Sequence, residues 1–120
     1  MISVNDTFLD SLLKTMSAEY KEYESVGYLI NGSNFRNKMT TLAGSADNIT
    51  SIQFSEIAPN EEDNYIEISN TDESYVSDYP TYMWYDNGAI NIYSKNKKLY
   101  LHEHSEAMFS NMQNLVSIDL

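Results

Sequence analysis

Residues 82–93 have the sequence Tyr82-Met83-Trp84-Tyr85-Asp86-Asn87-Gly88-Ala89-Ile90-Asn91-Ile92-Tyr93. Aromatic and aliphatic residues flank Asp86-Asn87-Gly88, whose members tolerate the positive φ angles that a tight hairpin turn requires. The stretch therefore predicts a β-hairpin. A second, lysine-rich turn over residues 94–98 leads to another β-rich run at residues 99–101.

The end of the chain carries a repeat-like strand. Its sequence is Leu115-Val116-Ser117-Ile118-Asp119-Leu120, which has the L-x-x-L-x-L spacing of a leucine-rich repeat. A repeat cannot bury its apolar face without a stacked neighbour. We therefore expect this chain to be an adapted fragment or the cap of something longer, with one repeat rather than an array.

Two helices are predicted upstream of the hairpin. Residues 6–24 place apolar side chains at three- and four-residue spacings, which is typical of an amphipathic helix. Ser33 or Asn34 would cap a second, short helix that Gly44 closes. The expected apolar face of this second helix consists of Phe35, Met39 and Leu42.

These elements predict one α+β domain over residues 1–120. Further strands are expected over residues 49–54 and 65–68. The N-terminal helix and the short second helix would pack on a small, mainly antiparallel sheet, which ends in one leucine-rich-repeat-like strand. A chain of 120 residues is long enough for one modest core.

The chain is strongly acidic and rich in tyrosine. It has eighteen acidic and seven basic residues, a formal net charge of −11, and ten tyrosines. This charge would repel nucleic acids and anionic membranes, so the expected partner is a protein with a basic surface. The absence of cysteine excludes disulfides and thiolate metal sites. No segment is long and apolar enough to cross a membrane.

An acidic region and the tyrosines beside it form the candidate partner-binding surface. Residues 56–78 contain no Lys or Arg, and acids around tyrosine anchors would steer an Arg- or Lys-rich partner to them. The alternatives are a solvated loop and a sheet whose tyrosines are structural, with Trp84 in the core. The expected binding residues are Glu61, Glu62, Asp63, Asp72, Glu73, Tyr79, Tyr82 and Tyr85.

His102 and His104, with Glu103 and Glu106 beside them, are the only candidate metal ligands. An H-x-H pair in a strand would place both rings on one face, and a carboxylate would have to complete the site. No nucleophile elbow, phosphate-binding loop or distinctive carboxylate pair is present. We favour an exposed turn, and we expect neither a cofactor nor an enzymatic activity.

Several motifs in order resemble a known family. They are Asn37-Lys38-Met39-Thr40-Thr41-Leu42-Ala43-Gly44, Asn48-Ile49-Thr50-Ser51-Ile52, Tyr82-Met83-Trp84-Tyr85-Asp86-Asn87-Gly88, Lys98-Leu99-Tyr100-Leu101, and Ala107-Met108-Phe109 before residues 115–120. Over residues 27–120 the chain resembles the region that precedes the repeats in BspA-like leucine-rich-repeat surface proteins of Firmicutes and mycoplasmas. The resemblance implies a sheet-and-helix cap of a solenoid that binds at a cell surface without enzymatic activity. Residues 1–26 are expected to be a helical extension outside the resemblance.

Three functions are hypotheses at this point. The first is a non-enzymatic protein-binding module that resembles the cap of a BspA-like surface protein. The second is a free-standing acidic inhibitor of bacteriophage or mobile-element type, for example an anti-CRISPR protein, that blocks the basic nucleic-acid groove of a host nuclease. The third, which we rank lowest, is a metal-dependent enzyme that uses His102 and His104.

The expected location depends on the start of the chain. If Met1 is the native start, we expect a cytoplasmic protein, because the first fifteen residues lack the features of a signal peptide. If the chain is a fragment of a larger protein, we expect it at the cell surface.

Overall fold

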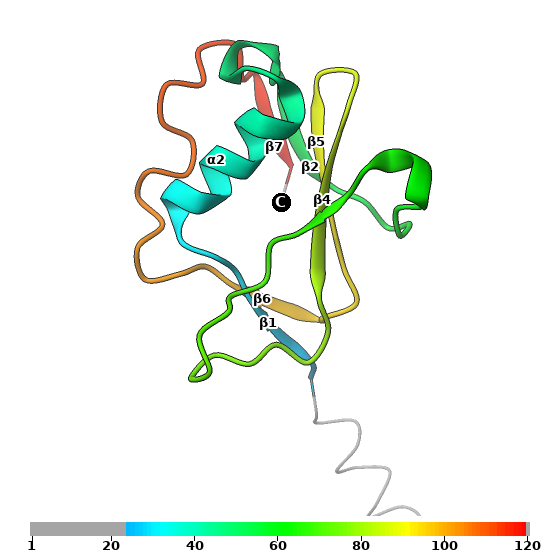
Figure 1. Cartoon of the computed structure of the whole chain (residues 1–120), viewed down its shortest axis with the longest axis vertical. Coiled ribbons are helices and arrows are strands. Elements are labelled where there is room, and N and C mark those ends of the chain that lie inside the picture. Colours follow the sequence, from blue (N-terminus) through cyan, green and yellow to red (C-terminus); the bar gives the residue numbers. More distant parts are fainter. Residues whose placement is uncertain (1–23, 120) are drawn as a thin grey trace, which may run out of the picture.

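The computed structural model describes residues 24–119 (Figure 1). The helix predicted over residues 6–24 lies outside these residues except for its last member, Glu24. In the described range no helix is long and apolar enough to cross a membrane. The α+β class is confirmed, with one main helix and short 3-10 turns on mixed sheets.

The main sheet has five strands in the order β3-β4-β5-β2-β7. They are β2 (Ser51–Phe54), β3 (Ile66–Glu67), β4 (Thr81–Asp86), β5 (Ala89–Ser94) and β7 (Ser117–Asp119). The β3–β4 and β4–β5 pairs are antiparallel, whereas β5–β2 and β2–β7 are parallel. The sheet is thus mixed rather than mainly antiparallel, because the long connection between β2 and β5 lets these two strands run in the same direction.

The predicted hairpin is confirmed. Thr81 pairs with Ser94 and Asp86 pairs with Ala89 across β4 and β5. Asn87 has φ 45° and Gly88 has φ 90°, which is the left-handed backbone that the sequence of this turn predicts.

A second sheet joins two distant segments in parallel. It consists of β1 (Val26–Tyr28) and β6 (Lys98–Tyr100), with Val26 opposite Lys98 and Tyr28 opposite Tyr100. Sequence patterns predict both segments as extended but cannot predict that they pair. In Figure 1 this sheet lies below the main sheet, at the foot of the domain.

Helix α2 (Gly32–Ala43) begins one residue earlier than its predicted cap. Asn31 is the N-cap, and its side-chain oxygen accepts a hydrogen bond of 2.8 Å from the N–H of Asn34. The prediction that Ser33 or Asn34 caps the helix is therefore wrong. Gly44 ends it at φ 84°, as predicted. A short 3-10 helix, η1 (Ala46–Asn48), follows.

The core lies between α2 and one face of the main sheet. The sheet contributes side chains at alternating positions of its strands, as the two-residue period of a strand requires. Trp84 is buried too, but it lies one position from Met83 and therefore on the opposite face. The buried residues at the centre of the core are Phe35, Met39, Ile49, Ile52, Ile68, Met83, Ile90 and Ile92.

The two faces of the main sheet have different covers. In Figure 1, α2 lies on one side of β4, and the loop with the 3-10 helix η2 (Glu61–Asp63) lies on the other. Residues 101–116 run beside α2 without a helix or strand, and their turns place Met108 and Met112 in the core.

Candidate functional site

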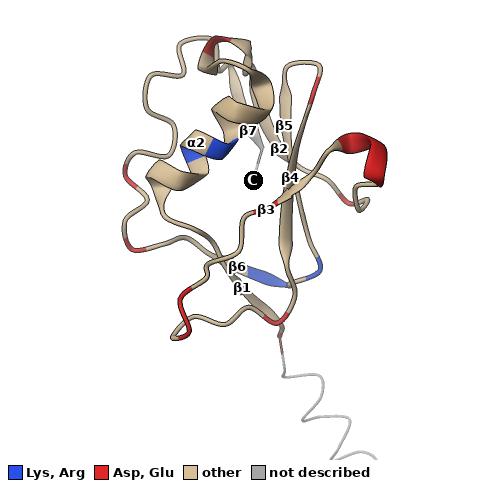
Figure 2. Cartoon of the chain, in the orientation of Figure 1, with Lys and Arg blue, Asp and Glu red and all other residues tan. Residues whose placement is uncertain are grey.

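The acids of η2 lie beside a pair of tyrosine rings. Asn60 and Asp63 cap η2, since the Asp63 carboxylate accepts a 2.9 Å hydrogen bond from the N–H of Asn60. Tyr65 follows Asn64, the C-cap of η2, and its ring packs edge-on against Tyr82 of β4 with 4.9 Å between centroids. Figure 2 shows η2 as acidic along its length. We name Glu61, Glu62, Asp63, Tyr65 and Tyr82 the acidic–tyrosine face.

Asp72 and Glu73 lie elsewhere, in a groove of about 420 Å³ along the loop between β3 and β4. The Asp72 carboxylate accepts a 2.9 Å hydrogen bond from the N–H of Ser74, so local turns shape this loop. Asp78, on the same groove, accepts a 2.8 Å hydrogen bond from the N–H of Val26 and ties the loop to β1.

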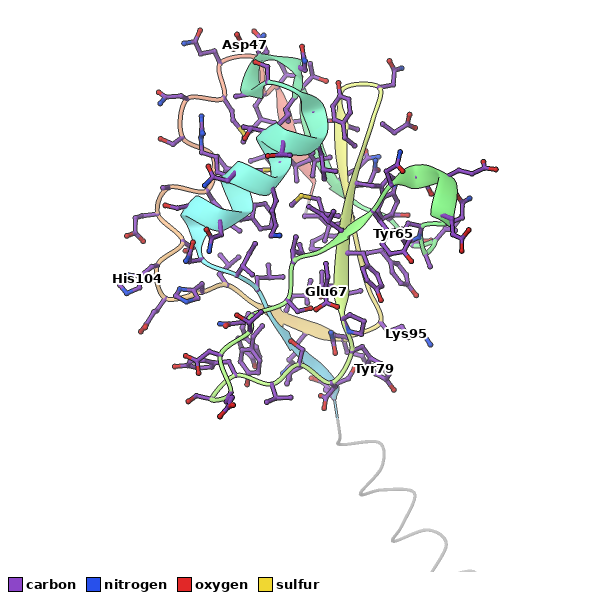
Figure 3. All side chains as sticks on the ribbon, in the orientation of Figure 1. Asp47, Tyr65, Glu67, Tyr79, Lys95 and His104 are labelled. Atoms are coloured by element: carbon purple, nitrogen blue, oxygen red, sulfur yellow. The ribbon has the colours of Figure 1, made fainter. Side chains whose placement is uncertain are left out.

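Tyr79 and Tyr85 have structural neighbours. Lys95 Nζ lies 5.7 Å from the centroid of the Tyr79 ring, within the range of a cation–π contact. Figure 3 shows this pair, with Tyr65 farther up the same side in this view. Tyr85 packs on the core and donates a 2.9 Å hydrogen bond from its hydroxyl to the carbonyl of Asn48.

The eight predicted binding residues therefore do not form one patch. Tyr82 joins the η2 acids, whereas Asp72 and Glu73 line a separate groove. Tyr85 lies three positions from Tyr82 in the same strand, so its side chain points to the opposite, helix-covered face.

The two histidines lie in a loop after β6 rather than in a strand. The Nδ1 atom of His102 accepts a 2.9 Å hydrogen bond from the N–H of His104. The carboxylates of Glu103 and Glu106 lie 3.9 and 4.0 Å from His104 nitrogens, and all three side chains are mostly exposed. Within residues 24–119 no three His, Asp or Glu side chains are grouped so that they could hold a metal.

A second aromatic cluster was not predicted. The ring centroid of Tyr28 lies 5.5 Å from those of both Tyr75 and Tyr100. These rings line a cavity of about 260 Å³, together with Leu101, Glu103 and neighbouring residues. The parallel pairing of β1 with β6 creates the cluster, and no local sequence pattern signals such a pairing.

The repeat-like spacing occurs twice rather than once. Residues 49–54 are Ile49-Thr50-Ser51-Ile52-Gln53-Phe54, with apolar residues at the same three positions as in residues 115–120. The two segments are neighbouring parallel strands, with Ser51 opposite Ser117 and Ile52 opposite Ile118. This internal match was available in the sequence and is the signal that could have predicted the pairing.

Burial falls steeply toward the open edge of this parallel arrangement. Ile90, Ile52 and Ile118 are register neighbours on β5, β2 and β7. Their exposed fractions are 0%, 1% and 44%. No strand of the described part of the chain pairs with the outer edge of β7, and Val116 just before it is also exposed.

Comparison with known protein families, curated proteins and solved structures finds no match for this chain. The resemblance to BspA-like proteins therefore stays a prediction. Three features of the described residues could bind a partner: the outer edge of β7, the acidic–tyrosine face and the cavity lined by Tyr28, Tyr75 and Tyr100.

Proposed function

We propose that this chain is a non-enzymatic protein-binding module whose β7 edge accepts a further parallel strand, in the way that the cap of a leucine-rich-repeat stack does. The decline in burial from Ile90 through Ile52 to Ile118 carries the proposal. An added strand would cover Ile118 and Val116 and would pair the outer N–H and C=O groups of β7, which no strand of residues 24–119 pairs.

The other edge of the main sheet, at β3, is less suited than β7 to accept a further strand. Residues that follow β1 cover the end of β3, since Leu29 forms a bridge with Ser69 and the N–H of Ile30 donates to the carbonyl of Ile68 at 3.1 Å. The edge beyond β7 lacks such a cover within the described residues. The two edges therefore differ, and β7 is the better acceptor.

A fusion experiment tests this proposal. Two leucine-rich repeats with the L-x-x-L-x-L spacing are added after Leu120, and urea unfolding and amide hydrogen exchange are measured. We expect a higher urea midpoint and slower exchange in β2 and β7, because a stacked repeat buries the exposed edge. The control fusion carries the same repeats with serine at the strand leucines. Equal midpoints for the two fusions would count against an acceptor edge.

The acidic–tyrosine face favours a second candidate function, an inhibitor of anti-CRISPR type that blocks the basic groove of a nuclease. Glu61 and Glu62 are exposed beside the Tyr65–Tyr82 pair. Carboxylates and tyrosine faces both attract the arginine and lysine side chains that line a nucleic-acid groove. The support for this role is the charge and aromatic content of the face.

A pull-down from bacterial lysate, read by mass spectrometry at low and high salt, tests the inhibitor role. We expect capture of a nucleic-acid-binding protein that high salt abolishes. The double variant Glu61→Gln/Glu62→Gln should lose the capture, whereas the matched control Asp47→Asn/Asp86→Asn should keep it. Equal capture by both variants would exclude the acidic–tyrosine face as the binding surface.

A further inference from the structure

We propose that the cavity between Tyr28, Tyr75 and Tyr100 binds the guanidinium group of an arginine side chain that a protein partner presents. We call it the tyrosine cavity. The inference rests on the proposed function as a protein-binding module and specifies one side chain of the partner.

Three aromatic rings form the tyrosine cavity. Tyr28 and Tyr100 stack with 5.5 Å between centroids and 22° between planes, and Tyr75 lies at 59° to Tyr28 at the same centroid distance. Two stacked rings and a third, tilted ring create walls of different orientation, which suits a planar group that can stack on one ring and meet the edge or face of another.

The backbone around these rings is hydrogen-bonded on several sides. The N–H of Leu29 donates to the carbonyl of Tyr100 at 3.0 Å, and the N–H of Asn70 donates to the carbonyl of Tyr28 at 2.7 Å. The N–H of Tyr28 donates to the hydroxyl of Ser77 at 2.9 Å. Segments from three parts of the chain thus meet here, and a ligand would find the cavity already formed.

The aromatic and aliphatic surface of the cavity is open to solvent. Tyr75, Tyr100 and Leu101 are 43%, 46% and 60% exposed. Core packing therefore leaves a large part of these side chains uncovered. Such surface gains free energy when a ligand covers it, and tyrosine and arginine are both enriched where binding energy concentrates.

Charge favours a cation over a neutral ligand. Glu103 and His102 are the titratable non-tyrosine residues of the lining, which contains no Lys or Arg. Asn70 is shared with the neighbouring groove that holds Asp72 and Glu73. The faces of the tyrosine rings are themselves electron-rich and attract cations. A guanidinium can stack on a ring and donate to the Glu103 carboxylate at the same time, which an ammonium does less well.

The size of the cavity limits the ligand. A volume of about 260 Å³ accommodates one long side chain but not a folded segment. A monosaccharide would also fit by size and could stack on tyrosine, but it would make no use of the negative charge. The test therefore compares a cation with its neutral analogue and with a sugar.

The experiment is an NMR titration of the isotope-labelled 120-residue protein with small probes. The probes are N-acetyl-arginine methylamide, the isosteric neutral N-acetyl-citrulline methylamide and methyl glucoside. We expect saturable shifts at Tyr28, Tyr75 and Tyr100 with the arginine probe, and at least about threefold weaker binding of the citrulline probe. Equal affinity for both amino-acid probes, or binding of the glucoside alone, would overturn the proposal.

Two variants locate the binding. Tyr75→Phe keeps the ring and should bind the arginine probe normally, whereas Tyr75→Leu should bind it at least about threefold more weakly. Phe54→Leu is the matched control and should leave the affinity unchanged, because Phe54 is 44% exposed, like Tyr75, but lies outside the tyrosine cavity and the acidic–tyrosine face. The titration needs no partner, so a negative result overturns the cavity proposal even if the repeat fusion or the pull-down supports the proposed function.

Discussion

At the scale of single residues, Gly32 shows how the absence of a side chain allows two segments to meet. Its N–H donates a 2.7 Å hydrogen bond to the carbonyl of His104. A Cβ at this position would lie 2.7 Å from the carbonyl carbon and oxygen of Ser105, which is closer than real Cβ contacts. The neighbour is backbone and cannot rotate away. The loop after β6 can therefore reach the start of α2 only because this residue is glycine.

Gly32→Ala should lower the free energy of unfolding by about 2 kcal/mol, because the loop or the helix must move to relieve the clash. Urea unfolding measures the effect. The adjacent, exposed Ser33→Ala is the control and should change stability by less than about 0.5 kcal/mol. If both variants were equally stable, the close approach of the loop to Gly32 would not exist in solution.

Lys98 and Glu24 form an exposed ion pair, with 2.9 Å between Nζ and Oε2. The hydrogen bond from Lys98, followed by its positive charge, holds the pKa of Glu24 below its ordinary value. A carboxyl whose pKa is lowered by folding stabilises the fold above its unfolded pKa, and this contribution disappears as the pH falls through the folded pKa.

Lys98→Met should therefore raise the pKa of Glu24 toward its ordinary value. An NMR pH titration of the Glu24 side chain measures this change directly. Lys95→Met, which removes a charge from the same turn, should leave the pKa of Glu24 where it is. A Glu24 pKa that does not respond to Lys98→Met would mean that the pair is not formed in solution.

At the scale of elements, the parallel strands β5, β2 and β7 differ in burial: the isoleucines of β5 and β2 are buried, whereas Ile118 of β7 is partly exposed. Ile52 has a strand on both sides and belongs to the buried core cluster that includes Phe35 and Met39 of α2. Among residues 24–119, Ile118 has a neighbouring strand on one side only. The same residue type at the same register thus has two environments. The same substitution at Ile52 and at Ile118 therefore compares a covered strand with an edge strand.

Ile52→Ala should lower the free energy of unfolding by about 3 kcal/mol, since it leaves a cavity in packed surroundings. Ile118→Ala should cost less than about 1 kcal/mol, because the side chain is already half in water. Chemical denaturation of the two variants provides the comparison. Equal losses would show that something covers β7 in the free protein and would remove the basis for an acceptor edge.

At the scale of the whole molecule, the net charge of −11 destabilises the folded state through repulsion between like charges. Figure 2 shows acidic segments at η2 and at several separate places in the loops, and basic ones on α2 and at β6. Among the described residues, Lys98–Glu24 is the one ion pair between a lysine and a carboxylate. Among residues 24–119 the acids outnumber the basic residues, and folding brings these negative charges closer together.

Raising NaCl from about 10 to about 150 mM should raise the urea midpoint, because the screening length falls to about 8 Å. The variant Glu61→Gln/Glu62→Gln should show a smaller increase, since it removes two charges from one short helix. A midpoint that falls with salt would mean that attractive pairs outweigh the repulsion at this scale.

Local patterns explain which parts of this fold are predictable. The hairpin, the end of α2 at Gly44 and the edge strand at residues 117–119 each depend on residues close in sequence, and the structure confirms them. The cap of α2 was displaced from Ser33 or Asn34 to Asn31, because several polar residues in a row can all serve as caps. The parallel directions of β2 and β7 were not predicted, although the matching apolar spacing of residues 49–54 and 115–120 is a signal for two stacked parallel strands.

The candidate sites show the same division. The sequence predicted a binding surface of acids and tyrosines. In the structure Tyr82 lies beside η2, whereas the side chain of Tyr85 packs on the helix-covered face of the sheet. The strand phase that separates these two residues was readable from their spacing of three. The tyrosine cavity was not, because Tyr28, Tyr75 and Tyr100 meet only through the β1–β6 pairing.

By itself, the sequence determined the α+β class, the hairpin turn, the acidic character and the repeat-like spacing, since each depends on composition or on residues a few positions apart. Only the tertiary structure decided that β1 pairs with β6, that no strand of residues 24–119 lies beyond β7, and that three distant tyrosines line one cavity. The physical reason is that strand pairing is a contact between segments far apart in the chain. Its partner and direction depend on the packing of the whole core rather than on any local preference.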